Sequence, residues 1–453
     1  MVYFCALHQH MREFFGVQLV HILAVAEGRL PALWKSQCWA WLGCYKVALA
    51  PLKGRPLPAQ PSVIRALAAC GQRPEATNLA RSIGSSQLRR SAASAVAAFD
   101  PALAAELLEG SPPTPLQAAV LSASGRKSAA QDVISRLEGR LVKNPNLALL
   151  QANCGELEPL AAFNETLSFF GLLPANSDGP PFPQSLCSSQ IAPRAYGPLV
   201  SIIVPAHNTE SLVAQAIGSL LDQTWSNIEI IAVDDASTDG TLQTLQRLAA
   251  QDSRVRVLSH PRNAGPYAAR MTALSVARGA LVTCHDSDDW AHPQRIERQA
   301  IPLMRNRRLM ATVSDWVRMA EDGTFYVRKS WPLIHHNPAS VMFRRQPVLD
   351  RMGGFDLVRA GADSEFYERL KVVFGPTAVL RAKGILAVGA HRPGSLMNDP
   401  KIGVTNHVLS PSRLAYWEAW RHWHVESLRA GRKPFMPPDG KRPFEAPSEL
   451  LLQ

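Results

Sequence analysis

Three carboxylates stand within four residues in the segment Cys284-His285-Asp286-Ser287-Asp288-Asp289-Trp290. Carboxylates this close repel one another unless a positive group lies between them. A divalent cation relieves that repulsion, because it prefers oxygen ligands and leaves positions open for phosphate oxygens. Two plainer interpretations stay open: Asp289 caps the helix expected near Pro293, or the segment is a solvated acidic turn.

Two further acids, Asp234 and Asp235, end an apolar run and are followed by Ala236-Ser237-Thr238-Asp239. The polar side chains that follow can accept hydrogen bonds from the free N–H groups that open a helix. Capping leaves the adjacent pair unexplained, whereas carboxylates at a strand end suit donors such as a base N–H or ribose hydroxyls. The turn Pro205-Ala206-His207-Asn208 stands in a similar place, although Pro and Asn are also ordinary turn residues.

The elements that must position these clusters alternate between strands and helices. Apolar runs at 199–204, 228–233, 255–258 and 280–284 predict buried strands, and helical spacing predicts helices at 211–221, 241–250 and 267–277. This alternation indicates βαβ units with a parallel sheet. All three polar clusters follow a strand, and ligands bind beyond the carboxyl ends of the strands in such sheets.

Residues 1–172 have a different texture and are predicted to be helical throughout. Two stretches, Leu67–Ala80 and Ala119–Val133, each contain a glycine between Ala-rich helical segments. Such turns are typical of helical-hairpin repeats, but an irregular helical domain fits the uneven spacing equally well. We therefore expect a helical domain at 1–172, a Pro-rich linker at 173–198, an α/β domain at 199–400 and a helical extension and tail at 401–453.

The composition limits the class of protein. The chain has 453 residues, enough for two or three domains, and its 46% hydrophobic content excludes wholesale disorder. The 48 Lys and Arg against 37 Asp and Glu give a formal net charge of +11, which indicates an anionic partner: nucleic acid, a membrane or a phosphorylated small molecule. The sequence contains no nucleic-acid-binding motif, so we expect no nucleic acid.

Cysteine usage and hydropathy bear on the compartment. The seven cysteines are scattered and form no C-x-x-C pair, which favours a reducing compartment over a disulfide framework. No apolar run reaches the roughly 20 residues of a spanning helix, and the N-terminus does not have the pattern of a signal peptide. We expect a cytoplasmic protein. Contact with the inner face of the membrane is compatible with that location.

Taken together, the motifs resemble the family 2 glycosyltransferases with the GT-A fold. The resemblance rests on Pro-x-x-Asn after the first strand, Leu221-x-Gln-Thr-Trp, Val233–Thr241, Asn263-Ala-Gly followed by Ala269-Arg270, and Asp286–Asp289. Its order and spacing hold across residues 199–289 and continue more weakly to residue 400. The resemblance implies a Rossmann-like, mostly parallel α/β catalytic domain, preceded here by an all-α domain that lies outside the match.

The resemblance also implies the reaction. Such enzymes transfer a sugar with inversion from a nucleotide-diphosphate sugar, with UDP-sugars favoured, to a hydroxyl of a glycan or lipid-linked acceptor. The products belong to polysaccharide or glycoconjugate biosynthesis. The matching positions imply that Asp234, with Asp235 nearby, recognises the nucleobase, while the turn at Pro205, Ala206 and Asn208 contacts the nucleotide.

The phosphates and the metal follow from the same match. It implies that Arg270 approaches the phosphates and that Asp288 is the direct ligand of Mn²⁺ or Mg²⁺, with Asp286 nearer to the ribose. His391 and Arg392 resemble a late basic loop of the family that closes over the diphosphate. A Pro-Gly surface turn is the alternative interpretation of that loop.

The match places the base that takes the acceptor proton at Asp363, with Glu365 as the reserve candidate. Ala362 stands where the family usually has an acid, and both acids also suit the first turn of a helix. His335 and His336 precede a predicted acceptor-side strand, and adjacent residues of an extended segment point in opposite directions. The Trp- and Arg-rich stretch 412–429 predicts an amphipathic helix that either packs in the core or meets a membrane.

Two functions of other classes compete with the transferase. A sugar nucleotidyltransferase would need a Gly-rich basic loop after the first strand, and the turn at 205–208 is not one. A non-catalytic helical-repeat scaffold with an inactive transferase domain is the second alternative. The presence of Asp286, Asp288 and Asp363 argues against it.

Overall fold

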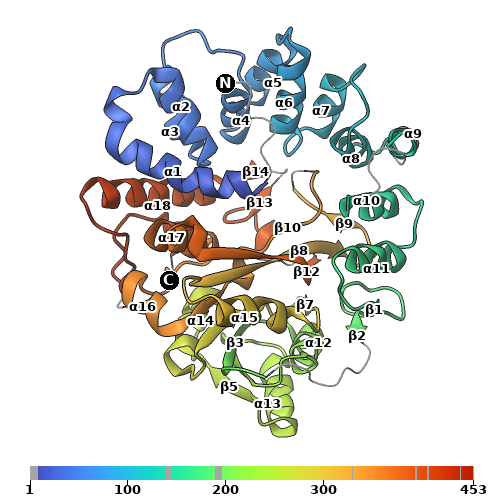
Figure 1. Ribbon diagram of the computed structural model, residues 1–453, viewed down its shortest axis with the longest axis vertical. Coiled ribbons are helices and arrows are strands. Elements are labelled where there is room, and N and C mark those ends of the chain that lie inside the picture. Colours follow the sequence, from blue (N-terminus) through green and yellow to red (C-terminus); the bar gives the residue numbers. More distant parts are fainter. Residues whose placement is uncertain are drawn as a thin grey trace.

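The computed structural model describes residues 9–137, 144–188, 196–328, 330–392, 395–405, 408–438 and 440–451. Figure 1 shows the helices of the N-terminal third as an arc over one side of an α/β region, with helix α18 (Pro411–Arg429) lying against the first of them. All described cysteines are free, and Cys5 lies outside the described residues.

The α/β region is built on a ten-stranded mixed sheet with the order β5-β4-β3-β6-β11-β8-β12-β7, and with β9 and β10 paired to β8. Four parallel strands form one half: β3 (Val200–Ala206), β4 (Ile228–Asp234), β5 (Val255–Ser259) and β6 (Leu281–Cys284). Every residue of β3 and β4 is buried, as expected for central strands covered on both faces.

The other half of the sheet is mixed. Its strands are β7 (Trp290–Ala291), β8 (Ala311–Ala320), β9 (Phe325–Tyr326), β10 (His335–His336), β11 (Met342–Arg344) and β12 (Val379–His391). β11 is antiparallel to β6 and β8, while β12 is parallel to β8 and antiparallel to β7. The reversal at β11 makes β8 and β12 the long strands beside the predicted active site.

Six helices of more than one turn accompany the described part of this sheet: α12 (Glu210–Leu221), α13 (Thr241–Gln251), α14 (Pro266–Val276), α15 (Arg295–Arg305), α16 (Arg345–Met352) and α17 (Ala362–Phe374). The four strands and three helices expected between residues 199 and 284 are all present, and their ends are within two residues of the expected ones. The expected alternation of buried strands and helices is therefore confirmed.

The N-terminal third consists of short helices: α1 (Gln9–Ala26), α2 (Ala32–Trp41), α3 (Tyr45–Leu49), α4 (Pro61–Ala69), α5 (Arg73–Arg81), α6 (Ser86–Val96), α7 (Pro101–Leu107), α8 (Pro115–Ala123), α9 (Lys127–Ser135), α10 (Asn146–Cys154) and α11 (Pro159–Phe169). The two stretches singled out from sequence form α4–α5 and α8–α9. Their turns match: Gly71 and Gly125 have φ of 83° and 81°, and the next residue donates to the carbonyl five positions back over 2.9 Å in both. Helices commonly end in this way, with a glycine in the left-handed region just after the last turn.

The helical part and the sheet share buried contacts. One apolar cluster runs from α4 through α11 to Val317 of β8 and Leu386 of β12, and Phe163 meets the Trp290 ring at 6.2 Å. The segment 173–188 is docked as well, with a short pair β1 (Ala175–Asn176) and β2 (Cys187–Ser188) and a buried Phe182. The helices are therefore positioned directly against the strands that border the site.

Helix α18 lies between α17 and α1. Its buried face includes Tyr416, Trp420 and His424, and the Trp417 indole donates to the Leu42 carbonyl over 2.8 Å. The packing interpretation of residues 412–429 is therefore confirmed. Among the helices that the structure describes, none combines the length and the apolar character that crossing a membrane requires.

Candidate active site at the carboxyl ends of the strands

The loops after β3 and β4 are locked together by hydrogen bonds. Asn208, in the left-handed region at φ 51°, accepts from the Thr238 N–H over 2.8 Å and donates its own N–H to the Ser237 hydroxyl over 3.0 Å. The Ala206 carbonyl accepts from the Asp235 N–H over 2.8 Å. In this structure Asn208 joins the loop after β3 to the loop after β4.

The two acids that end β4 have different surroundings, although both are buried. Asp235 accepts from the N–H groups of Ala264 and Gly265 over 2.8 and 2.7 Å, and its other contact is the His260 ring at 2.7 Å. Within the described residues, the Asp234 carboxylate accepts only from the Ser237 N–H, and its Oδ1 is buried without a partner. A buried carboxylate oxygen without a partner is unfavourable, so Asp234 is the acid that a donor group on a ligand would satisfy.

Asp235 therefore has a positioning task. Gly265 precedes α14, and α14 carries Arg270. The carboxylate of Asp235 ties the start of this helix to the end of β4, which sets the depth at which Arg270 enters the site.

Arg270 is a buried cation with spare donors. Its side chain is 4% exposed, and its Nη2 donates to Asp286 over 2.7 Å. The Nε and Nη1 groups are buried and have no partner, while the guanidinium lies 4.9 Å from the Tyr267 ring. Burial acts to lower the pKa of Arg270, but charge interactions with Cys284, Asp286, Tyr267 and Asp363 outweigh burial and raise it. The Nε and Nη1 groups of Arg270 are therefore available to donate hydrogen bonds to acceptor oxygens beside Asp286.

The acidic loop brings Asp286, Asp288 and Asp289 together as expected. Asp288 accepts from the Arg392 Nε over 2.9 Å, and Asp289 accepts from the Ala390 N–H over 3.1 Å. Burial raises the pKa of Asp288 and, more strongly, that of Asp289, where Asp288 and then Asp286 add repulsion. Asp289 has a structural part here, since it fastens the loop to β12.

The acidic loop fits a divalent cation that is shared with a ligand. Asp286 and Asp288 offer carboxylate oxygens, and the repulsion among the three acids favours an added positive charge. Within the described residues, no group of three or more His, Cys, Asp and Glu side chains is arranged to hold a metal ion. The donor set is thus incomplete on its own, and phosphate oxygens of a ligand would have to complete it.

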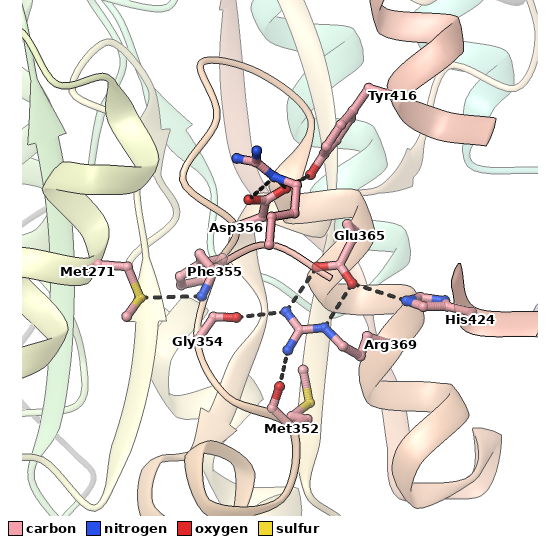
Figure 2. Close-up of polar contacts among 10 residues, drawn as sticks. Met271, Met352, Gly354, Phe355, Asp356, Glu365, Arg369, Tyr416 and His424 are labelled. Carbon is pink, nitrogen blue, oxygen red and sulfur yellow. Dashed lines mark hydrogen bonds and ion pairs between the residues drawn. The ribbon is translucent and has the colours of Figure 1, made fainter. Parts of the chain in front are cut away.

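The two candidate bases lie in different environments. Asp363 is half-buried in the first turn of α17, where its Oδ1 accepts from the Ser364 N–H over 2.8 Å. Glu365 is fully buried, and Arg369 binds it through Nε at 2.8 Å and Nη2 at 2.9 Å while His424 meets it at 3.1 Å (Figure 2). Arg369 and His424 engage both oxygens of Glu365, which leaves Asp363 as the acid of this pair that can reach a ligand.

The Glu365 cluster supports the segment Gly353–Asp356. Figure 2 shows Arg369 reaching the Gly354 carbonyl, at 2.7 Å, and the Met271 sulfur accepting from the Phe355 N–H, at 3.3 Å. Asp356 accepts from the Tyr416 hydroxyl over 2.9 Å, which connects α18 to the same segment. This network fixes the loop before α17, and Asp363 with it.

The late basic loop reaches the site through Arg392. His391 stacks on Tyr326 of β9, with ring centroids 3.9 Å apart and 8° between the planes. Pro393 and Gly394 lie outside the described residues. As expected for an extended segment, His335 and His336 face opposite ways: His335 meets Trp316 at 5.5 Å and His336 meets Tyr367 at 5.4 Å.

Sequence reasoning missed Trp316 and Arg318 of β8 and Arg413 of α18. The Arg318 guanidinium lies 5.1 Å from the Trp316 ring, and its charge acts on the carboxylates of Asp288 and Asp289. Arg413 lies within electrostatic reach of Asp363. The spacing of two between Trp316 and Arg318, which places both side chains on one face of a strand, was the one sign in the sequence that they act together.

Part of the chain is similar in sequence to known glycosyltransferases. Residues 201–366 match the family model for glycosyl transferase family 2. An uncharacterized glycosyltransferase of Haemophilus influenzae is 39% identical over 113 residues, which cover 25% of this chain and 45% of the relative. A putative teichuronic acid biosynthesis glycosyltransferase of Bacillus subtilis, TuaG, is 38% identical over 129 residues, which cover 28% of this chain and 51% of the relative.

The chain thus spans about half the length of these curated relatives. Among solved structures, S. aureus TarS 1-349 in complex with UDP-GlcNAc aligns with a TM-score of 0.38 and 19% identity, covering 54% of this chain and 68% of that one. The family match covers β3 to the first turns of α17, which includes the acidic loop and Asp363. Residues 201–366 form a glycosyltransferase family 2 domain.

Proposed function

We propose that the protein is an inverting, metal-dependent glycosyltransferase. It would take a sugar from a nucleotide-diphosphate sugar, with UDP-sugars favoured, and attach it to a hydroxyl of a glycan or lipid-linked acceptor. The family match supports transferase activity, and the name of the TuaG relative supports a place in polysaccharide biosynthesis.

The observation that carries the proposal is the pair of Arg270 and Asp286. A buried guanidinium with two unpartnered N–H groups is unfavourable by itself and becomes favourable when phosphate oxygens accept from it. Asp286 holds that guanidinium at the edge of the acidic loop, so a bound diphosphate would lie between Arg270 and Asp288. The unpartnered Oδ1 of Asp234 would accept from the base at the other end of the nucleotide.

The reaction is a single displacement. The acceptor oxygen forms a bond to the anomeric carbon while the bond from that carbon to the diphosphate oxygen breaks, and its electron pair leaves with the diphosphate. The Asp363 carboxylate takes the acceptor proton. Asp288, with Asp286, would hold Mn²⁺ or Mg²⁺, which neutralises charge on the departing diphosphate. Arg270 and Arg392 add positive charge at the same place.

The test is a donor screen with the purified protein. Binding and slow hydrolysis of UDP-, GDP- and TDP-sugars are measured by calorimetry and by nucleotide release, with Mn²⁺, with Mg²⁺ or with EDTA. We expect sugars of one nucleotide base to bind only when a metal ion is present. The Asp288→Asn variant should lose this metal-dependent binding. Asp132→Asn, at an exposed position of helix α9, is the matched control and should behave as wild type.

Failure of every donor to bind, with the protein folded, would overturn the proposal and favour the non-catalytic scaffold. Binding that is equally strong in EDTA would overturn the metal requirement alone.

A further inference from the structure

The strands beyond the acidic loop carry a group of aromatic and basic side chains that the donor site does not use. Trp316 and Arg318 alternate along β8, so both lie on the face that bears the site. Gly389 of β12 pairs with Arg318, and a Cβ at Gly389 would come 2.6 Å from Cζ3 of Trp316. Only glycine leaves room for the indole to lie across β12, with the Arg318 guanidinium against its ring.

Two donors in this group have no partner. The Nε1 of Trp316 and the Nε of Arg318 are both buried without a hydrogen bond. Leaving a buried donor unsatisfied is unfavourable, so acceptor oxygens from a ligand would be stabilising here.

The stacked rings of Tyr326 and His391 form a second side of the group. Tyr326 pairs with Arg318 between β9 and β8, and His391 directly precedes Arg392, which holds Asp288. The group therefore adjoins the acidic loop. Flat ring faces with a polar edge are the surfaces on which sugar rings and cations pack.

Arg328 and Arg413 add two more cations. Burial lowers the pKa of both, and their charges act on each other; Arg328 also lies near Tyr326, and Arg413 near Arg318 and Asp363. Among the described residues, Arg318, Arg328 and Arg413 form no ion pair with a carboxylate, although 16 other ion pairs join Arg, Lys or His side chains to acids. All three side chains are half-buried, and half-buried cations that form no ion pair favour an anionic ligand.

We infer that Arg318, Arg328 and Arg413, with Trp316 and the Tyr326–His391 stack, form an acceptor subsite that selects a glycan bearing an oxyanion. This inference rests on the proposed transferase function and names the class of its acceptor. The anion is either a phosphate or the carboxylate of an acidic sugar. Its position beside Asp363 places the attacking hydroxyl on the same acceptor unit or on the adjacent one.

The test uses the full chain and three probes: glucose 6-phosphate, glucuronate and glucose. UDP binding with Mn²⁺ is measured first, and its absence would count against the proposed function alone. The probes are then titrated by calorimetry with UDP and Mn²⁺ present. We expect an anionic probe to bind at least about tenfold more tightly than glucose, since one charge-assisted contact is worth about 1.5–3 kcal/mol. The preferred anion distinguishes phosphate from carboxylate.

Variants distinguish binding of the anion at this subsite from attraction by the overall positive charge of the protein. Arg318→Gln and Arg413→Gln should each remove the preference for the anionic probe and keep the circular dichroism spectrum, and Arg413→Gln should also leave UDP affinity within about twofold. Arg318→Lys should restore part of the preference. Arg247→Gln removes the same charge from an exposed position of α13 and should change neither the preference nor UDP affinity. Equal binding of the three probes by wild type, or a preference that survives both glutamine variants, would overturn the inference.

Discussion

Asn153 of α10 clamps Phe325 of β9 with two hydrogen bonds. Its Nδ2 donates to the Phe325 carbonyl over 2.7 Å, and its Oδ1 accepts from the Phe325 N–H over 2.8 Å. Further along the same segment, Ile334 donates its N–H to Asn146 over 2.8 Å. The helical part thus holds the chain between β8 and β10, which carries the inferred acceptor side chains next to Phe325.

Removing this clamp should weaken acceptor binding and spare the donor. In Asn153→Ala the backbone of Phe325 loses both partners, so Tyr326 and Arg328 are no longer fixed against β8. We expect the KM for the acceptor to rise about fivefold or more, since the two lost bonds are worth about 0.5–1.5 kcal/mol each. UDP affinity, measured by calorimetry, should stay unchanged.

The chain contains a matched control for that variant. Asn164 of α11 makes the same two bonds with Ala175, at 2.9 and 2.8 Å, but Ala175 belongs to β1. Asn164→Ala should lower the melting temperature as much as Asn153→Ala and leave the acceptor KM alone. Equal KM changes in the two variants would show that the clamp acts only through global stability.

Much of the sheet and of the donor site was predictable from the sequence, because both are local. Buried strands appear as apolar runs, and each polar cluster lies within a few residues of a strand end. The pairing of Arg270 with Asp286 was not predicted, although the two residues are only 16 positions apart. Arg270 lies in α14, and Asp286 follows β6, the next strand along the chain. Such short-range relationships follow from the βαβ order itself.

The remaining features depend on tertiary contacts that no local pattern encodes. Arg318, Arg328 and Arg413 come from a strand, a loop and the last long helix, so in the sequence they are three scattered charges. Glu365 lies two positions from Asp363, about 200° around the helix, which turns it into the core. The Arg at its i+4 position was a usable sign of a buried pair.

The two acids at the end of β4 should separate into a ligand contact and a structural support. Asp234→Asn replaces a carboxylate that has an unpartnered oxygen, so we expect UDP affinity to fall about tenfold with little change in melting temperature. Asp235→Asn places an amide N–H against the N–H groups of Ala264 or Gly265. This should cost about 2–3 kcal/mol of unfolding free energy. Calorimetry and urea unfolding check the pair, and identical behaviour of the variants would contradict the assignment.

Stability should fall as the pH drops from 7 to 5. Burial lowers the pKa of His285 and His336 to about 3 and that of His292 to about 4, from an unfolded value of 6.5. Between these values the unfolded chain binds protons that the native chain does not, so the stability present above pH 6.5 is lost on acidification. His292 is one such group: its Nδ1 accepts from the Gln294 N–H over 3.1 Å, and a protonated Nδ1 could not accept this bond. The variant His292→Gln removes this titrating group.

The measurement is the melting temperature of wild type and His292→Gln at pH 7, 6 and 5. The difference between the two curves isolates His292 from every other titrating group. We expect the variant to be less stable at pH 7 and to lose less stability on acidification. Parallel curves would mean that folding does not shift the pKa of His292.

The two acids of α17 should give opposite results. Asp363→Asn removes the proposed base and leaves the fold unchanged, so we expect kcat to fall by at least about 100-fold, within the range for loss of a general base. UDP-sugar affinity and melting temperature should match wild type. Glu365→Gln leaves Arg369 buried without its counter-ion, so it should lose about 3–5 kcal/mol of unfolding free energy. If Asp363→Asn turns over normally while Glu365→Gln is folded but inactive, the base has been assigned to the wrong acid.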